Sequence, residues 1–271
     1  MAAGSLDAQR LWDIASAVRE QAPLVHNITN LVVMNNTANA LLALGASPAM
    51  AHALDEVEDF VAISQSLVIN IGTLDAEQIA ACKLAAARAN TVGIPWILDP
   101  VGAGATPYRK TAASALARLK PGVIRGNGSE ILALTQQAQT GQGRGGVDSL
   151  DGSESALDAA QLLAQQIGTV VAVTGAVDYV ADGQRVAAIY NGHPLMTRVT
   201  GLGCSATAVI GAFLAVERDV FAATVAALAI FGVAGEIAAE MAQGPGRLQV
   251  ALLDALYGLE QSVFVNRAKI K

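Results

Sequence analysis

Short apolar runs alternate with segments of helical periodicity along most of this chain, and this alternation constrains its fold more than any other feature. The strand-like runs are residues 67–72, 96–100, 123–125 and 169–173, and the helical segments are residues 6–21, 30–44, 55–64, 76–90, 108–119 and 155–166. Strands that are apolar on both faces are typical of parallel sheets covered by helices. The sequence therefore predicts an α/β fold with a mostly parallel central sheet flanked by helices on both faces.

The last third of the chain departs from this alternation. Residues 179–190 resemble a hairpin that turns at Asp182-Gly183, and helices are expected from Cys204 to the end. The apolar stretch 220–235 lies between Asp219 and Glu236 and falls short of the roughly 20 residues that a membrane span needs. We therefore expect a buried central helix there rather than a transmembrane segment.

Length and composition limit the classes of function. A chain of 271 residues without a Pro/Ser-rich linker is expected to form one domain over residues 1–271. The net charge of −6, without a Lys/Arg cluster, excludes nucleic acid as a partner and leaves small molecules or further copies of the chain. A hydrophobic content of 53% indicates a large core or an oligomer interface.

The N-terminus and the cysteines indicate the compartment. Residues 1–15 contain charged side chains and no continuous apolar region of the kind that a secretory signal has. The two cysteines, Cys82 and Cys204, form neither a disulfide framework nor a metal-ligand spacing. We therefore expect a cytoplasmic protein with no membrane partner.

Polar or glycine residues follow each predicted strand of the sheet. Gly72, Asp99, residues 125–127 and residues 174–175 occupy these positions. Ligands of open α/β sheets bind beyond the carboxyl ends of the strands. These four strand ends are predicted to face one cleft.

The turn Gly201-Leu-Gly-Cys204 precedes an apolar helix expected over residues 206–216. Backbone N–H groups at a helix N-terminus favour an anion such as a transferring phosphate, so the turn is a candidate site with Cys204 as its reactive side chain. The alternative is that Cys204 is a small buried hydrophobic residue, as most cysteines are. Both interpretations are open from the residues alone.

Asp99 and Glu130 are the candidate metal ligands. Asp99 ends a strand before Pro100, where it also suits a simple turn. Glu130 lies three residues after Asn127, a spacing that is typical of a helix capping box. A Mg²⁺ ion bound mainly through water and phosphates needs only one or two carboxylates, so capping and metal binding are compatible roles for Glu130.

Two nucleotide-binding motifs do not apply. Gly141, Gly143 and Gly146 match G-x-G-x-x-G, but the preceding residues 136–139 (QQAQ) are no strand, so we expect a surface loop. A P-loop sequence is absent. Any nucleotide chemistry must use another architecture.

Several longer motifs in order carry a resemblance to a known family. They are residues 23–30 (PLVHNITN), 45–50 (GASPAM), 70–73 (NIGT), 98–106 (LDPVGAGAT), 125–130 (RGNGSE) and 173–175 (VTG). With these motifs the chain resembles the hydroxyethylthiazole kinase family of the ribokinase-like superfamily. The resemblance implies ATP- and Mg²⁺-dependent phosphorylation of the hydroxyl of 4-methyl-5-(2-hydroxyethyl)thiazole in thiamine biosynthesis, by a homotrimer with active sites at its subunit boundaries.

The resemblance also implies roles for single residues. Met50 and Gly201 bind the thiazole, Arg125 and Thr174 bind ATP, Asp99 and Glu130 bind the metal, Cys204 lies beside the reacting hydroxyl, and Asn27 lines the pocket. Two positions depart from the family pattern: Leu202 replaces a threonine, and Gly128 replaces an alanine. Neither change removes a charged or nucleophilic group, so the expected function stands.

The role of Cys204 and three rival functions are open at this point. A thiol with a pKa of about 8.5 is mostly protonated at neutral pH, although a helix N-terminus and Mg-ATP could favour the thiolate. We therefore predict a positioning group and weak base, since phosphoryl transfer depends more on alignment and electrostatics than on a base. The rivals are a hydroxymethylpyrimidine or pyridoxal kinase, an acyl-transfer enzyme with Cys204 as covalent nucleophile, and a catalytically silent ligand-binding trimer. No histidine motif supports the covalent rival.

Overall fold

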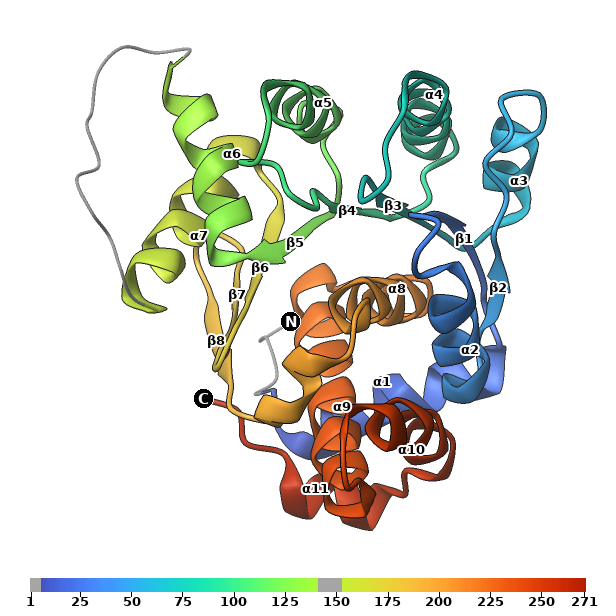
Figure 1. Cartoon of the computed structure of the whole chain (residues 1–271), viewed down its shortest axis with the longest axis vertical. Coiled ribbons are helices and arrows are strands. Elements are labelled where there is room, and N and C mark those ends of the chain that lie inside the picture. The colour runs from blue at the N-terminus through green and yellow to red at the C-terminus, as the bar shows by residue number, and fades with distance from the viewer. Residues whose placement is uncertain (1–5, 141–152) are drawn as a thin grey trace.

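The computed structural model describes residues 6–140 and 153–271, and an eight-stranded sheet runs through this part of the chain (Figure 1). The strands lie in the order β2-β1-β3-β4-β5-β6-β7-β8. Strands β1 to β6 pair in parallel, and β7 pairs antiparallel with both β6 and β8. The bounds are β1 Leu24–Ile28, β2 Ser47–Ala49, β3 Ser66–Asn70, β4 Trp96–Asp99, β5 Val123–Asn127, β6 Val170–Thr174, β7 Asp178–Ala181 and β8 Val186–Ile189.

Helices cover both faces of the sheet (Figure 1). One face carries α3 (Val57–Ile63), α4 (Ala76–Val92), α5 (Pro107–Ala117), α6 (Gly128–Thr140) and α7 (Ser153–Ile167). The other side carries α1 (Ala8–Gln21), α2 (Met34–Leu44), α8 (Leu202–Leu214), α9 (Val220–Met241), α10 (Pro245–Gly258), α11 (Gln261–Arg267) and the 3-10 turn η1 (Pro194–Arg198). The prediction of a mostly parallel sheet covered on both faces is confirmed.

Alternate strand residues supply two separate cores. In β3, Leu67 and Ile69 pack into the core beneath α3 to α7, whereas Val68 packs into the core that contains α8 and α9. All three side chains are buried. Burying one such side chain contributes about 1.5–3 kcal/mol, so a strand that is apolar at every position is held from both sides. This two-sided packing fixes the strand ends that form the site.

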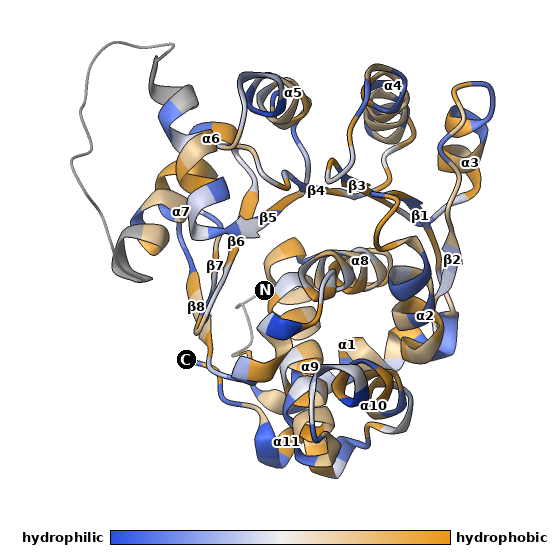
Figure 2. Cartoon of the chain, in the orientation of Figure 1, coloured by the Kyte–Doolittle hydropathy of each residue, from blue (hydrophilic) through white to orange (hydrophobic). Residues whose placement is uncertain are grey.

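Helix α9 is the buried central helix that the sequence predicts. By length and composition it is apolar enough to cross a membrane, but 83% of its most apolar window is buried inside the protein, as in the core helix of a soluble protein. Figure 2 shows α8 and α9 mostly in pale to hydrophobic colours between the sheet and α10. Both helices belong to one core with α1, α2 and α10.

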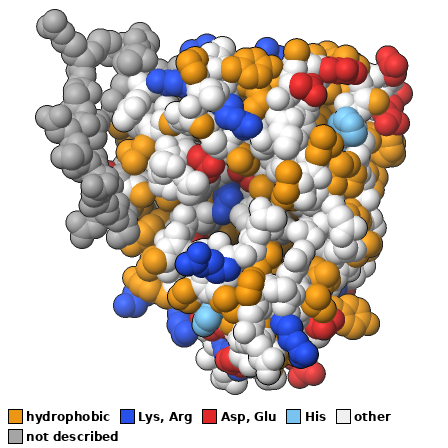
Figure 3. Space-filling view, in the orientation of Figure 1, with side chains coloured by type: hydrophobic (Ala, Val, Ile, Leu, Met, Phe, Trp, Pro, Cys, Tyr) orange, Lys and Arg blue, Asp and Glu red, His pale blue; other side chains and the backbone are white. Residues whose placement is uncertain are grey.

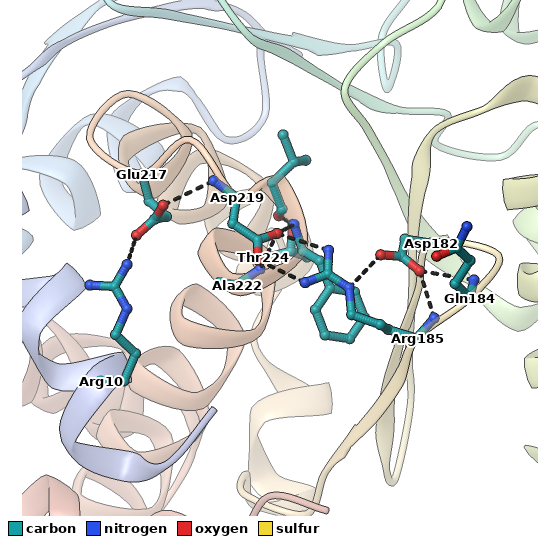
Figure 4. A network of polar contacts seen from close by, with 10 residues as sticks. Arg10, Asp182, Gln184, Arg185, Glu217, Asp219, Ala222 and Thr224 are labelled. Carbon is teal, nitrogen blue, oxygen red and sulfur yellow. Dashed lines mark hydrogen bonds and ion pairs between the residues drawn. The ribbon is translucent and has the colours of Figure 1, made fainter. Parts of the chain in front are cut away.

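A network of charged side chains fastens the predicted hairpin to the start of α9 (Figure 4). Arg185 donates to Asp182 at 2.6 Å and to both oxygens of Asp219 at 2.7 and 2.9 Å, and its guanidinium lies 4.3 Å from the ring centroid of Phe221. Asp219 also caps α9 by accepting from the Phe221 amide at 3.1 Å. The hydrogen bond from Arg185 keeps the pKa of Asp219 below its ordinary value.

The structure differs from the predicted elements in two strands and at the start of one helix. Strands β1 and β2, at 24–28 and 47–49, were not predicted, since β1 contains the polar residues His26 and Asn27 and β2 has three residues that include Pro48. Helix α8 begins at Leu202 rather than at 206, so Cys204 lies inside its first turn. The glycine motif at 141–146 lies outside the described residues. The turn at Asp182-Gly183 is confirmed.

Candidate functional site

Four strand ends and the first turn of α8 meet at the carboxyl edge of the sheet. Asn70 and Asp99 are register partners in β3 and β4, and Asn127 and Thr174 are partners in β5 and β6. The strand ends are therefore neighbours, as predicted. The prediction that all of them face one cleft holds for Arg125, Thr174 and Gly175, which line a common cavity, and not for Gly72 and Asp99, which are not part of its lining. The edge presents carboxylate, amide, hydroxyl and guanidinium groups within a small region.

Asp99 lies at the centre of this edge and is completely buried. Its Oδ2 accepts from Asn70 Nδ2 at 2.8 Å and from Thr207 Oγ1 at 2.8 Å, and Arg125 Nη1 lies 3.8 Å away. Burial raises the pKa of Asp99 to about 6, although Arg125 opposes the shift. Within residues 6–140 and 153–271, Asp99 Oδ1 has no hydrogen-bond partner. A buried carboxylate oxygen without a partner is suited to a cation or to a water molecule bound to one.

Glu130 lies in the first turn of α6 and completes a cap whose N-cap residue is Asn127. Its Oε2 accepts from the Asn127 amide at 2.8 Å, and Asn127 Oδ1 accepts from the Glu130 amide at 3.0 Å. This reciprocal pair is a capping box, so that interpretation is confirmed. Oε1 accepts from the Gly102 amide at 2.8 Å and so joins the loop after β4 to α6.

A metal ion at this edge would rest mainly on Asp99. Both oxygens of Glu130 already bind amides, although a carboxylate oxygen has a second lone pair for a further ligand. The described residues contain no group of three or more His, Cys, Asp or Glu side chains that could hold a metal by themselves. Two carboxylates suit Mg²⁺ that takes its remaining ligands from water and phosphate. The residues present therefore fit a Mg²⁺ site of this kind.

Cys204 is joined to Asp99 through two asparagines. Asn30 Nδ2 lies 3.5 Å from Cys204 Sγ and donates to Asn70 Oδ1 at 2.9 Å, and Asn70 in turn donates to Asp99. Burial and the nearby charge of Asp99 raise the pKa of the Cys204 thiol to about 11. The thiol is protonated at neutral pH, so the helix N-terminus does not produce a thiolate here.

The asparagine beside Cys204 is Asn30 and not Asn27. Asn27 is buried in β1 and donates to the Val25 carbonyl at 2.8 Å, and its place in the pocket lining stays a prediction. Both residues belong to the 23–30 motif. What distinguishes the two asparagines is where β1 ends: Asn27 lies within the strand and Asn30 lies beyond it.

Two of the three histidines make hydrogen bonds away from Cys204. His26 Nε2 lies 2.7 Å from the Ala51 carbonyl, and His193 Nδ1 accepts from the Leu195 amide at 3.1 Å. Neither ring shares a hydrogen bond with the thiol. A covalent mechanism needs a base beside the thiol, and the described contacts of Cys204 supply none.

Two glycines shape the anion-binding turn. Gly201 has φ +81°, and a Cβ there would lie 2.4 Å from Val33 Cγ1. A Cβ on Gly203 would lie 2.7 Å from Arg125 Nη1, so the guanidinium packs directly against the first turn of α8. Arg125 also donates to Thr174 Oγ1. Helix amides, a guanidinium and a hydroxyl together form a site for an anion.

A cavity of about 530 Å³ opens beside this turn. Figure 3 shows the hollow on this face, with a basic side chain inside it. Its polar lining includes Arg125, Thr174, Asp178, Asn191 and His193, and its apolar lining includes Met196, Leu202, Ala206, Leu228 and Phe231. An anionic group and a flat apolar group both find partners here.

Met50 lies apart from this cavity. It follows β2, whose place in the sheet is four strands from β5 and Arg125. At about 4.8 Å per strand this separation is roughly 19 Å. Met50 is half-buried and is not among the cavity-lining residues. Its role in thiazole binding stays a prediction, as does that of Gly201.

Comparisons with known proteins agree on one family. A model described as the hydroxyethylthiazole kinase family matches residues 15–262. A hydroxyethylthiazole kinase from Granulibacter bethesdensis is 56% identical over 261 residues, which cover 96% of this chain and 94% of that protein.

Two solved structures extend the comparison. The structure of a hydroxyethylthiazole kinase protein from Pyrococcus horikoshii OT3 superimposes with a TM-score of 0.90 at 46% identity and covers 96% of this chain and 98% of that one. A ribokinase-like superfamily protein from Enterococcus faecalis V583 matches with a TM-score of 0.62 at 14% identity, over 89% of this chain and 88% of that one. The second likeness concerns the fold alone, which is ribokinase-like.

Proposed function

The chain belongs to the hydroxyethylthiazole kinase family, and on that premise we propose that it transfers the γ-phosphoryl group of ATP to the hydroxyl of 4-methyl-5-(2-hydroxyethyl)thiazole in thiamine biosynthesis. The observation that supports this most directly is the contact of Arg125 with both Thr174 and the first turn of α8. This contact creates an anion site next to Cys204. A phosphoryl group held there would lie near the hydroxyl that attacks it.

ATP would use the cavity beside Arg125. The guanidinium, the Thr174 hydroxyl and the amides at 202–204 would bind the phosphates. The apolar side of the cavity, formed by Leu228, Phe231 and Leu202, would contact the base. The departure at Leu202 adds apolar surface to this wall instead of a hydroxyl.

Asp99 and Glu130 would hold Mg²⁺. When bound, the ion would neutralise charge on the transferring phosphates. Asp99 supplies the unpartnered Oδ1, and Thr207 and Asn70 orient its other oxygen. Glu130 fixes the positions of the Gly102 and Asn127 amides at the same edge.

Cys204 would position the thiazole alcohol. Because the pKa of the thiol is raised to about 11, Cys204 is protonated at neutral pH and so is not available to accept the hydroxyl proton. Its neighbour Asn30 makes it part of an uncharged polar chain. The hydroxyl proton can leave late in a loose phosphoryl-transfer transition state. Alignment by Cys204 and charge stabilisation by Arg125 would therefore account for most of the rate.

We also propose a cytoplasmic homotrimer whose active sites lie at subunit boundaries. Leu31 and Val32 follow β1 at the carboxyl edge of the sheet and are 69% and 63% exposed. Met50 lies at the end of the neighbouring strand, so a second subunit packed on this apolar surface would bring it into a shared site. The free cysteines, Cys82 and Cys204, are compatible with a reducing compartment.

A coupled ADP-release assay tests the proposed function. ADP should appear only when the thiazole alcohol, ATP and a divalent cation are all present. The same assay with hydroxymethylpyrimidine and pyridoxal tests the neighbouring kinase activities. Equal turnover of either alcohol, or turnover in excess chelator, would contradict the proposal.

A further inference from the structure

The wall of the cavity that faces α9 is formed by residues 191–194. Gly232 of α9 passes directly against it: a Cβ on Gly232 would lie 2.9 Å from both Cβ and the carbonyl oxygen of Asn191. The Leu228, Phe231 and Gly232 side of the cavity is part of a rigid core helix. The width of the cavity therefore depends on how the 191–194 wall is held.

Asn191 is the residue that holds this wall from behind. It is buried, and its side-chain amide is fully used. Oδ1 accepts from the Lys269 amide at 2.7 Å, and Nδ2 donates to the Arg267 carbonyl at 2.9 Å and to Glu236 Oε1 at 3.1 Å. All three bonds lead to α9 or to the segment 267–271, and none leads to the rest of the cavity.

Glu236 completes the support from α9. Its Oε1 also accepts from the Gly192 amide at 3.3 Å and lies 3.2 Å from Lys269 Nζ. The segment itself pairs with β8, because the Ala188 and Tyr190 amides donate to the carbonyls of Lys271 and Lys269 at 2.8 and 2.9 Å. None of residues 267–271 lines the cavity. Their contribution to it must act through Asn191 and Gly192.

We propose that Asn191 and Glu236 are positioning residues that fix the wall of the nucleotide cavity to the segment 267–271. The inference rests on the proposed function only in assigning this cavity to ATP. In the proposed function Arg125 and Thr174 bind the phosphates from β5 and β6, so loosening the 191–194 wall weakens nucleotide binding without moving the thiazole subsite. The expected signature is a change in the KM for ATP with kcat and the KM for the thiazole alcohol preserved.

Glu240 provides a matched control. It lies one turn after Glu236 on the same helix and pairs with Arg267 at 2.6 and 3.1 Å, so it also contacts the segment 267–271. Its side chain is 60% exposed, whereas that of Glu236 is 16% exposed. Only Glu236 touches Asn191 and Gly192. The two glutamates separate support of the wall from simple attachment of the segment.

The experiment compares Asn191→Ala, Glu236→Ala and Glu236→Gln with Glu240→Ala. Loss of a buried hydrogen-bonded group predicts an increase of about tenfold in the KM for ATP for Asn191→Ala and Glu236→Ala. Glu236→Gln keeps an oxygen for Gly192 and should recover most of this loss. Glu240→Ala should change the KM for ATP less than twofold. Circular dichroism and light scattering check that each variant is folded and assembled like the parent.

Three results would overturn the proposal: an unchanged KM for ATP in Asn191→Ala and Glu236→Ala, an equal rise in the KM for the thiazole alcohol, or the same effect in Glu240→Ala. Calorimetric titration with ATP alone gives the same comparison without turnover. If the parent protein binds ATP but does not phosphorylate the thiazole alcohol, that result contradicts the proposed function. The calorimetric comparison of the variants still tests the role of Asn191 and Glu236.

Hydrogen exchange on the parent protein supplies a second readout. If the affinity for ATP depends on an ordered 191–194 wall, thermodynamic linkage requires that bound ATP in turn stabilises that wall. Saturating ATP should slow exchange of the Lys269 amide, which donates to Asn191, more than that of the Leu248 amide, which donates to the Gly244 carbonyl at 3.0 Å in α10. Equal effects at the two amides would contradict the proposal.

Discussion

The guanidinium of Arg125 occupies the space that a side chain at Gly203 would need. A Cβ on Gly203 would lie 2.7 Å from Nη1 and 3.0 Å from Nη2 of Arg125. The absence of this one carbon lets a β5 side chain pack against the first turn of α8. The proposed anion site is thus formed by two elements that lie far apart in the sequence.

Gly203→Ala should displace Arg125 and weaken ATP binding. Arg125 makes a charged hydrogen bond to Thr174, and losing the alignment of such a group costs about 1.5–3 kcal/mol, or roughly ten- to a hundredfold in the KM for ATP. Steady-state kinetics with varied ATP measure this effect. An unchanged KM for ATP would show that Arg125 has room to bind ATP from another position.

Gly128→Ala is the corresponding control in the neighbouring helix. A Cβ there would meet Ala156 Cβ at 3.4 Å, which is an ordinary van der Waals contact. The substitution should leave the KM for ATP unchanged and stabilise α6 by up to about 1 kcal/mol. Chemical denaturation measures the stability, and a destabilised variant would mean that the start of α6 needs glycine.

Arg185→Ala should lower stability without affecting catalysis. The variant loses ion pairs to Asp182 and Asp219 and the contact with the Phe221 ring (Figure 4). These groups are partly exposed, so the expected loss in the free energy of unfolding is ~1 kcal/mol. Urea denaturation should show a smaller loss at high salt, because salt screens the ion pairs. A loss that does not depend on salt would assign the effect to packing on Phe221.

The strand ends were predictable because their signal is local. An apolar run followed by Asp99 or by Thr174 places each polar group at the carboxyl edge once the sheet is parallel, and register then brings the groups together. The capping box at Glu130 was readable for the same reason. The strand ends and the capping box are each recognised from residues that lie close together in the sequence.

Other parts of the site depend on packing between distant segments and were not readable. Asn30 reaches Asn70 because β1 pairs with β3, and it reaches Cys204 because α8 packs against these strands, an arrangement that no local pattern reveals. The raised pKa of Cys204 is a result of burial and of Asp99, whereas the sequence showed only a helix N-terminus. Strand β2 has three residues and gives no periodic signal. In each case the missing information is tertiary.

Asp178→Asn should raise stability near neutral pH. Burial raises the pKa of Asp178 to about 6, against the opposing effects of the Gly175 amide and Arg125. A carboxyl whose pKa is higher in the folded state than in the unfolded state stabilises the fold below its ordinary pKa, and this contribution is lost as the pH rises through about 6. Asparagine can still accept from the Gly175 amide and carries no charge.

The measurement is the free energy of unfolding from pH 4 to 8 for both proteins. The parent should lose stability between about pH 4 and 6 relative to the variant, by on the order of 1–3 kcal/mol at pH 7. Parallel curves over the whole range would show that Asp178 does not titrate in this window. Asp99 carries a similar shift and is unchanged in the variant, so only the difference between the curves is assigned to Asp178.

Substitutions of Cys204 separate positioning from covalent catalysis. Cys204→Ala removes the thiol but keeps the helix turn and Arg125, so turnover of the thiazole alcohol should slow by roughly ten- to a hundredfold and remain measurable. Cys204→Asp should also remain active, since a carboxylate is ionised at neutral pH and can accept a proton there, whereas a thiol whose pKa is about 11 is already protonated. A covalent mechanism requires the opposite, because neither alanine nor aspartate can form a thiol adduct. Steady-state rates are measured after light scattering has confirmed that assembly matches the parent. If both variants bind ATP and the thiazole alcohol but neither turns over, Cys204 does more than position the hydroxyl.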